Sequence, residues 1–295
     1  MAALHHRPHI AVMLALLAAW TGALATGAAT EAATEVATEV ATSTAGGKPA
    51  GWKLVWADEF DADGLPDPSK WAYDTTANRT GWYNKELQYY ASGRRENAEV
   101  KNGRLVITAR KEALASMPDY GGQAYTSARL VTRGKASWTQ GFIEVRARLP
   151  CAPGSWPAIW MLGTGGKWPA DGEIDIMEHV GHKPGEILGS IYTNAQNWPR
   201  GTGKTSRTMV PDACDAFHDY QLTWTKDRIL VGVDGRNYAE LANPHDGDYD
   251  KWPFDRPQYL LLNLAVGGDL GGTVRDDSLP WRMEVEYVRV FQPAR

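Results

Sequence analysis

The segment Asp171-Gly-Glu-Ile-Asp-Ile-Met-Glu-His-Val180 places three carboxylates within six residues and interleaves them with large apolar side chains. On a β-strand alternate residues share a face, so Glu173 and Asp175 point one way and the isoleucines the other. Strict alternation would send Glu178 into the apolar layer, where a lone carboxylate is costly. A β-bulge with Met177 as the extra residue resets the alternation. The segment therefore predicts a bulged strand with its three acids in one row.

The same two-residue alternation of apolar and polar side chains recurs along the chain from Gly51 onward. It is clearest in the stretches 104–110, 141–148, 220–224, 229–233 and 283–290. Turn-forming pairs such as Asn102-Gly103 and Asp234-Gly235 separate the stretches, and no long segment has helical periodicity. Many short strands joined by tight turns predict an all-β domain, either a sandwich or a barrel.

A row of three acids is costly as structure but useful as chemistry. One carboxylate can stay ionised as a nucleophile while a neighbour, its pKa raised, holds a proton to give away. A retaining glycosidase needs two such carboxyls about 5 to 5.5 Å apart. Four strand steps put the Cα atoms of Glu173 and Glu178 about 13 Å apart, so side-chain reach and a curved sheet must close the gap. The alternatives are a solvated acidic face or a site for a divalent cation.

Composition narrows the classes of partner. The chain has 295 residues, a net charge of −4 and no block of basic residues, which argues against binding to nucleic acid. It contains 13 Trp but only 5 Phe. Such an excess of Trp fits a surface that stacks on sugar rings, with a Trp-rich core as the alternative.

The N-terminal region has the features of an export signal. Arg7 precedes an apolar run over 10–19, and Ala23-Leu-Ala25 offers a cleavage site. The run is shorter than the ~20 apolar residues of a spanning helix, which disfavours an uncleaved anchor. Residues 26–50 repeat Ala, Thr and Glu without any aromatic residue, which predicts a disordered linker. We therefore expect a signal peptide over 1–25, a linker over 26–50, a folded domain over 51–295, and a secreted protein.

The two cysteines, Cys151 and Cys214, both lie in the part expected to be exported. In an oxidising compartment an isolated pair usually forms a disulfide. Closing a loop of this length would stabilise the fold by about 4 kcal/mol in the chain-entropy model. Two buried free thiols are the alternative. Neither cysteine has a metal-ligand neighbour in the sequence, which argues against a zinc site.

The run Glu-Ile-Asp-Ile-Met-Glu over 173–178 closely resembles the signature of the laminarinase-like branch of glycoside hydrolase family 16. The resemblance covers nearly all of 51–292, and includes Trp56-Ala-Asp-Glu-Phe-Asp61, Trp156-Pro-Ala-Ile-Trp-Met161 and Asn263-Leu-Ala-Val-Gly-Gly268. It implies a concanavalin A-like β-jelly-roll sandwich with a concave substrate cleft. It also implies retaining endo-hydrolysis of β-1,3-glucan, extending to mixed β-1,3-1,4-glucan.

Carried over to this chain, the resemblance makes Glu173 the nucleophile, Glu178 the acid/base, and Asp175 a helper whose charge keeps Glu178 protonated. It also implies a set of substrate-binding residues: Trp156, Trp160, Asn84, Arg129, Glu86 and Tyr192. The two tryptophans share a face of their strand, as sugar platforms or as core. Asn84 and Arg129 match positions that hydrogen-bond glucose, and a plain surface role for Arg129 is the alternative. Glu86 is either a cleft contact or a buried partner of an arginine. Tyr192 stands where a cleft histidine is common.

Many members of this family hold a structural calcium ion, and Glu59, Gly103 and Glu286 match its ligand pattern. Glu286 departs from the usual Asp, although calcium accepts any hard oxygen ligand. No cofactor is required for the chemistry that the resemblance implies.

Three rival functions stay open. An agarase or carrageenase of the same family would act on galactans, but a sulfated galactan should bring a cluster of Lys and Arg that the chain lacks. A transglycosylase would pass the glycosyl-enzyme to a sugar instead of water. A non-catalytic β-glucan-binding protein would have lost the two glutamates, and both are present. We expect a monomer that acts on a polysaccharide and has no membrane partner once the signal is removed.

Overall fold

The structure, a computed structural model, describes residues 47–294. The predicted signal peptide, and all but the last residues of the predicted linker, lie outside the described residues. Within 47–294 no helix combines the length and apolar character needed to cross a bilayer.

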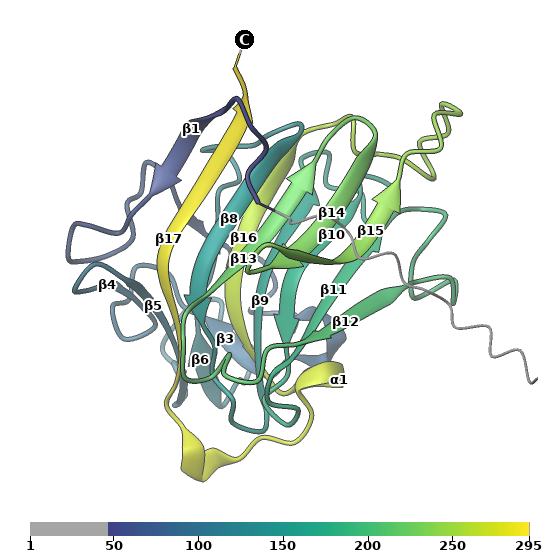
Figure 1. Cartoon of the computed structure of the whole chain (residues 1–295). Helices are drawn as coiled ribbons and strands as arrows, with labels where there is room; N and C mark the ends of the chain where they lie inside the picture. The colour runs from purple at the N-terminus through teal and green to yellow at the C-terminus, as the bar shows by residue number, and fades with distance from the viewer. Residues whose placement is uncertain (1–46, 295) are drawn as a thin grey trace, which may run out of the picture. The chain divides into compact units, whose positions relative to one another are not determined.

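The domain consists of two β-sheets that pack face to face, with mainly antiparallel strands (Figure 1). The first has the order β15-β14-β13-β8-β17-β5-β6-β3, with β1 beside β17 and β4 beside β5. Its strands are β1 (Trp52–Asp58), β3 (Gln88–Tyr90), β4 (Ala98–Val100), β5 (Leu105–Lys111), β6 (Tyr125–Ser127), β8 (Gly141–Arg148), β13 (His218–Trp224), β14 (Arg228–Val233), β15 (Arg236–Ala242) and β17 (Trp281–Pro293).

The second sheet has the order β12-β11-β10-β9-β16-β7-β2. Its strands are β2 (Ala72–Tyr73), β7 (Arg129–Val131), β9 (Ser155–Gly163), β10 (Glu173–His179), β11 (Glu186–Tyr192), β12 (Thr205–Met209) and β16 (Gln258–Val266). The helical elements described are short: η1 (Tyr83–Lys85), α1 (Gly268–Gly271) and η2 (Asp276–Ser278). The all-β sandwich predicted from the alternation is confirmed.

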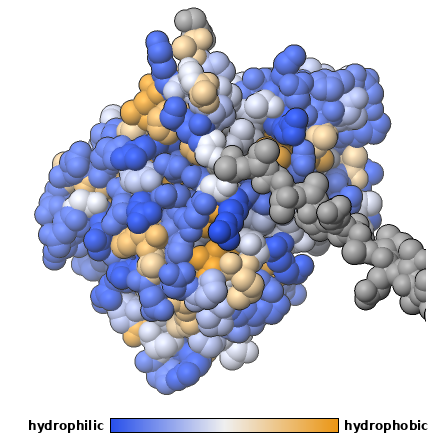
Figure 2. Space-filling view, in the orientation of Figure 1, coloured by the Kyte–Doolittle hydropathy of each residue, from blue (hydrophilic) through white to orange (hydrophobic). Residues whose placement is uncertain are grey.

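Alternating side chains of both sheets build the core between them. In β8 Ile143, Val145 and Ala147 are fully buried, and on the facing sheet Ile159 and Met161 of β9 join the same apolar cluster. The outward residues of the strands are mainly polar, and Figure 2 shows a face on which hydrophilic residues dominate and apolar residues form only small spots. The central strand β16, which lies between β9 and β7, is buried along its whole length.

The predicted bulge lies in β10. Asp175 pairs with Trp160 of β9 and Met177 pairs with the next residue, so Ile176 has no partner there. The extra residue on this side is therefore Ile176 rather than Met177. Both side chains are fully buried in the core. Burying two successive residues restores the alternation, and Glu178 returns to the face that carries Glu173.

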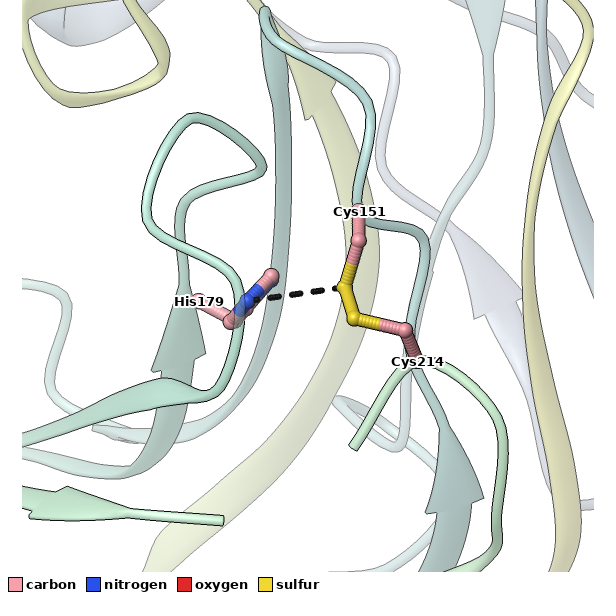
Figure 3. A group of neighbouring side chains, drawn as sticks. All are labelled: Cys151, His179 and Cys214. Carbon is pink, nitrogen blue, oxygen red and sulfur yellow. Dashed lines mark hydrogen bonds between the residues drawn. A yellow bond between two sulfur atoms is a disulfide. The ribbon is translucent and has the colours of Figure 1, made fainter. Parts of the chain in front are cut away.

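The predicted disulfide is confirmed. Cys151 follows β8 and Cys214 precedes β13, and their Cα atoms are 5.7 Å apart. His179, at the end of β10, is fully buried and directs its ring at the disulfide (Figure 3). Its Nε2 lies 3.7 Å from the sulfur of Cys151 and accepts a hydrogen bond from the Gly185 amide. The disulfide therefore packs against the end of the strand that carries the acids.

Candidate active site

A cavity of about 520 Å³ lies on the outer face of the seven-stranded sheet. Strands β7, β9, β10 and β16 supply its floor, and the loops before β3 and β10 supply its walls. It brings together eight of the nine residues predicted for catalysis and substrate binding: Asn84, Glu86, Arg129, Trp156, Trp160, Glu173, Asp175 and Glu178. Residues far apart in the sequence thus converge on one site.

Burial governs the acidity of the carboxyl row. Burial, helped by the charge of Glu173, raises the pKa of Glu178 to about 7. Burial also raises the pKa of Glu173, but hydrogen bonds from Asp175 and Trp168 work against that rise. Asp175 is only 3% exposed, and burial together with the charges of Glu173 and Glu178 raises its pKa well above the usual range. The three acids therefore differ in their readiness to ionise.

Asp175 acts on Glu173 through a hydrogen bond, and the role expected from the sequence, a charge that keeps Glu178 protonated, stays a prediction. Burial and the charges of Glu173 and Glu178 raise the pKa of Asp175, which favours its protonated form, and its hydrogen bond lowers the pKa of Glu173. A donor beside Glu173 favours the ionised form of that glutamate. Burial is the main cause of the raised pKa of Glu178, and the charge of Glu173 adds to it. A linear pattern of acids does not reveal this effect of burial.

Two indole groups bind the outer carboxyls of the row. Trp156 of β9 donates to Glu178 Oε1 at 3.0 Å. Trp168, in the loop between β9 and β10, donates to Glu173 Oε2. Trp168 is missing from the residues predicted from the sequence. One feature of the sequence could have indicated it. Trp168 lies five residues before Glu173, in the loop that leads into the strand of acids.

Arg129 lies between two aromatic rings. Its guanidinium is 5.1 Å from the ring centre of Trp82 and 4.7 Å from that of Trp160, and Nε is 3.1 Å from an Asp74 oxygen. It is 7% exposed, so a plain surface role does not hold. Trp160 in turn donates to Asn263 Oδ1 at 2.7 Å. Stacking and an ion pair hold Arg129 at the cavity wall with its orientation set.

The loop before β3 brings Asn84 and Glu86 to the same wall. Asn84 has φ of 56°, a left-handed conformation that Asn tolerates better than most residues. Glu86 accepts a hydrogen bond from Gln88 at 2.9 Å, and burial raises its pKa. It lines the cavity, and the charge of Arg129 acts on it without a direct ion pair. Of the two sequence alternatives, the structure matches the cleft contact.

Tyr192 is not among the residues that line the cavity. It pairs with Glu173 across β10 and β11, and its ring meets Trp168 edge-on at 6.5 Å. Trp198 also packs on Trp168, at 6.1 Å, and does line the cavity with 63% of its surface exposed. Tyr192 thus backs the Trp168 ring, and Trp198 extends the aromatic wall.

Two of the three residues predicted to hold calcium are paired with arginines. Glu59 accepts two hydrogen bonds of 2.8 Å from Arg289. Glu286 accepts one of 2.9 Å from Arg146. A cation bound with Gly103 would have to displace these guanidinium groups, so the residues as arranged do not fit a calcium ion. The calcium site stays a prediction.

Within residues 47–294, one cluster of metal-binding residue types has its ligand atoms close together: Cys151, His179 and Cys214, within 4.8 Å of one another (Figure 3). Both sulfurs are consumed by the disulfide. Zinc is bound by thiolates, so this cluster is not a metal site as it stands.

Comparisons with known proteins agree with the geometry. A β-glucanase of Rhodothermus marinus is 49% identical over 252 residues, which cover 82% of this chain and 85% of that protein. A solved variant of a non-specific endo-β-1,3(4)-glucanase, presenting 1,3-β-D-cellobiosyl-glucose at its active site, is 55% identical, with a TM-score of 0.83 over 84% of this chain and 97% of that one. The laminarinase from Rhodothermus marinus is 47% identical, with a TM-score of 0.78 over 83% of this chain and 98% of that one.

The model of the family described as glycosyl hydrolases family 16 matches residues 85–289, which include the bulged strand and every residue of the carboxyl row. The fold, the row of acids and the comparisons all lead to the family that the sequence motif suggested: the chain belongs to glycosyl hydrolases family 16.

Proposed function

We propose that this protein is a secreted, retaining endo-glycosidase that hydrolyses β-1,3-glucan of the laminarin type and mixed β-1,3-1,4-glucan. One observation carries the proposal. Two carboxyls of a single strand have different environments: burial and the charge of Glu173 raise the pKa of Glu178 to about 7, whereas hydrogen bonds from Asp175 and Trp168 oppose the rise that burial causes in the pKa of Glu173. That division is what acid and nucleophile need.

In the first step Glu178 gives its proton to the glycosidic oxygen while Glu173 attacks the anomeric carbon, so the C–O bond to the leaving sugar breaks and a glycosyl ester forms. Asp175 donates to Glu173, which keeps that carboxylate ionised and oriented before attack. In the second step Glu178, now ionised, removes a proton from water, and the water oxygen replaces Glu173 at the same carbon. Two inversions return the β configuration.

The rest of the cavity suits a neutral sugar chain. Trp156, Trp160, Trp168 and Trp198 present aromatic surface to it, and Asn84, Glu86 and Asn263 present polar groups. The basic residues of the lining are Arg129, Arg133 and Lys167, and Arg129 is paired with Asp74. This lining offers no cluster of free cations for a sulfated galactan, which favours glucan over carrageenan. The relatives support both linkage types, since one is a non-specific endo-β-1,3(4)-glucanase and another a laminarinase.

A substrate panel tests the reaction class. Purified protein is incubated with laminarin, lichenan, agarose and carrageenan, and the products are separated by size and read for reducing ends. We expect a ladder of short oligosaccharides from laminarin and lichenan and none from the galactans. With an added short laminarin oligosaccharide as acceptor, products longer than that oligosaccharide would instead identify a transglycosylase. No product from any polymer, with binding retained, would identify a glucan-binding protein.

Azide rescue tests the roles of the two glutamates. Glu178→Ala should still form the intermediate from an aryl glycoside with a good leaving group, and azide should give a β-glycosyl azide. Glu173→Ala should need azide in place of the nucleophile and should give the α-azide. Reversed anomers would mean that the roles are exchanged. α-Configured ends released from a β-glucan by the unaltered enzyme would refute retention altogether.

Export rests on the sequence of the first 25 residues. Expression of the full chain should deliver the protein outside the cytoplasm with a new N-terminus close to residue 26. N-terminal sequencing of the cytoplasmic and exported fractions measures this, and an exported protein that begins at Met1 would contradict cleavage.

A further inference from the structure

The bulge that aligns the carboxyl row interrupts backbone pairing. Ile176 has no partner in β9. On the other side Asp175 pairs with Ser190 and Glu178 with Leu188, so Ile176 and Met177 together face the single residue Gly189. A buried carbonyl left without a donor is destabilising, and a strand released from its bulge would drift toward regular register. A one-residue shift would turn Glu178 away from the cavity. Something must hold the bulge in place.

Tyr238, from β15 of the opposite sheet, supplies the missing donor. Its hydroxyl donates to the Ile176 carbonyl at 2.8 Å and lies 3.2 Å from the carbonyl of Leu188. Because the hydroxyl has one proton, its stronger hydrogen bond is to the nearer carbonyl, that of Ile176. Burial raises the pKa of Tyr238 well above its usual range, which keeps the group a donor. One side chain thus joins the bulged strand and its neighbour β11.

Two local features direct Tyr238 to this point. In β15, Ala239 pairs with Val231 and Asn237 with Gly232, so Tyr238 is itself the extra residue of a second bulge. A bulge re-aims the side chain that it carries. On β11, a Cβ atom at Gly189 would come within 2.9 Å of the Tyr238 ring and hydroxyl. The glycine opposite the first bulge therefore makes room for the ring.

We propose that Tyr238 is a positioning residue for catalysis: its hydroxyl holds the bulge between Asp175 and Glu178 and so sets how the acid/base meets the rest of the row. Tyr238 is not among the residues that line the cavity, so it acts through the backbone and not on substrate. The inference rests on the proposed function, because the row it positions is the one assigned to hydrolysis.

The test compares two Tyr→Phe variants of the full chain. Tyr238→Phe removes the hydroxyl and keeps the ring. Tyr220→Phe makes the same change at a fully buried tyrosine of β13 whose hydroxyl has no hydrogen-bond partner among residues 47–294. On laminarin we expect kcat of Tyr238→Phe to fall about tenfold with KM within about twofold, because the lost bond orients a catalytic group without touching substrate. Tyr220→Phe should keep both values.

Titration of Glu178 provides a readout that does not require turnover. A loosened bulge lets water reach Glu178, and burial is the main cause of its high pKa. In Tyr238→Phe the pKa of Glu178, followed by NMR of the labelled carboxyl, should fall below that of the unaltered protein, and the basic limb of the pH–rate profile should shift with it. Gly189→Ala, which crowds the ring but keeps the hydroxyl, should produce the same changes.

The outcomes separate the two proposals. If the unaltered protein cleaves laminarin while Tyr238→Phe keeps kcat and the Glu178 pKa and loses only thermal stability, Tyr238 is merely structural and the positioning role is refuted. If the unaltered protein cleaves no β-glucan, the proposed function is refuted, and the Glu178 titration alone decides the positioning role: a lower pKa in Tyr238→Phe supports it and an unchanged one overturns it.

Discussion

The hydrogen bond from Trp156 to Glu178 gives a prediction whose sign and size follow from the structure. The indole N–H lies 3.0 Å from Glu178 Oε1. Burial and the charge of Glu173 raise the pKa of Glu178 to about 7, and this hydrogen bond acts against them by favouring the ionised carboxylate. Trp156→Phe removes the donor and leaves an aromatic ring at a position that is only 6% exposed. The pKa of Glu178 should therefore rise.

The size follows from the difference between two hydrogen bonds. A hydrogen bond to a charged group contributes about 1.5 to 3 kcal/mol, and one between neutral groups about 0.5 to 1.5 kcal/mol. The midpoints of these ranges differ by about 1.2 kcal/mol, which corresponds to about one pKa unit. Since Glu178 must be protonated when Glu173 attacks, the basic limb of kcat/KM should move from about pH 7 to about pH 8. The acid limb reports Glu173, whose hydrogen bonds come from Asp175 and Trp168 and not from Trp156, so this limb should stay in place.

The assay is the pH dependence of kcat/KM on laminarin from reducing-end release. Trp160→Phe is the matched control, because it also removes a cavity indole, but one that donates to Asn263 and not to a carboxyl. An aryl glycoside with a good leaving group adds a second check, since glycosylation then needs no acid and should lose the basic limb in every variant. This account of Glu178 would be refuted if the basic limb of the pH profile of Trp156→Phe stayed in place or moved to lower pH.

Three further predictions concern stability and the extent of the cleft. Because the pKa of Glu178 is raised from 4.5 to about 7 by folding, the unaltered protein loses up to about 3 kcal/mol of stability as the pH rises through that window. Glu178→Gln should therefore melt higher than the unaltered protein at pH 8 and equally at pH 4, and equal melting at both would contradict the burial argument. Replacing Cys151 and Cys214 by Ala should lower the free energy of unfolding by about 4 kcal/mol, seen in denaturant midpoints, whereas two titratable thiols in the unreduced protein would exclude the disulfide. Trp198→Ala should raise KM for laminarin a few fold and leave kcat on short oligosaccharides unchanged, because one exposed stacking contact is worth about 1 kcal/mol. An unchanged KM would show that the chain does not reach this residue.

The strands, the bulge and the row of acids were all predictable from the chain alone. Side chains on a strand alternate with a period of two, so a run such as Glu173 to Glu178 shows which residues share a face and where the alternation must break. The same local rule covers the long strands β8 and β17. Turn pairs such as Asn102-Gly103 mark their ends, because their backbone conformations are rare elsewhere. Each of these inferences needs only neighbouring residues.

The charge states and the supports of the site depend on groups brought together by folding. The pKa of Asp175 is raised because burial opposes its ionisation, and burial is a property of the packed sheets. Trp168, in the loop before β10, donates a hydrogen bond to Glu173. Arg289 donates a hydrogen bond to Glu59, which lies 230 residues earlier in the chain. Tyr238 meets the bulge from another sheet, 62 residues beyond Ile176. The residues in these contacts are far apart in the sequence, and no repeating pattern of side chains connects them. Only the packing of the two sheets reveals such contacts.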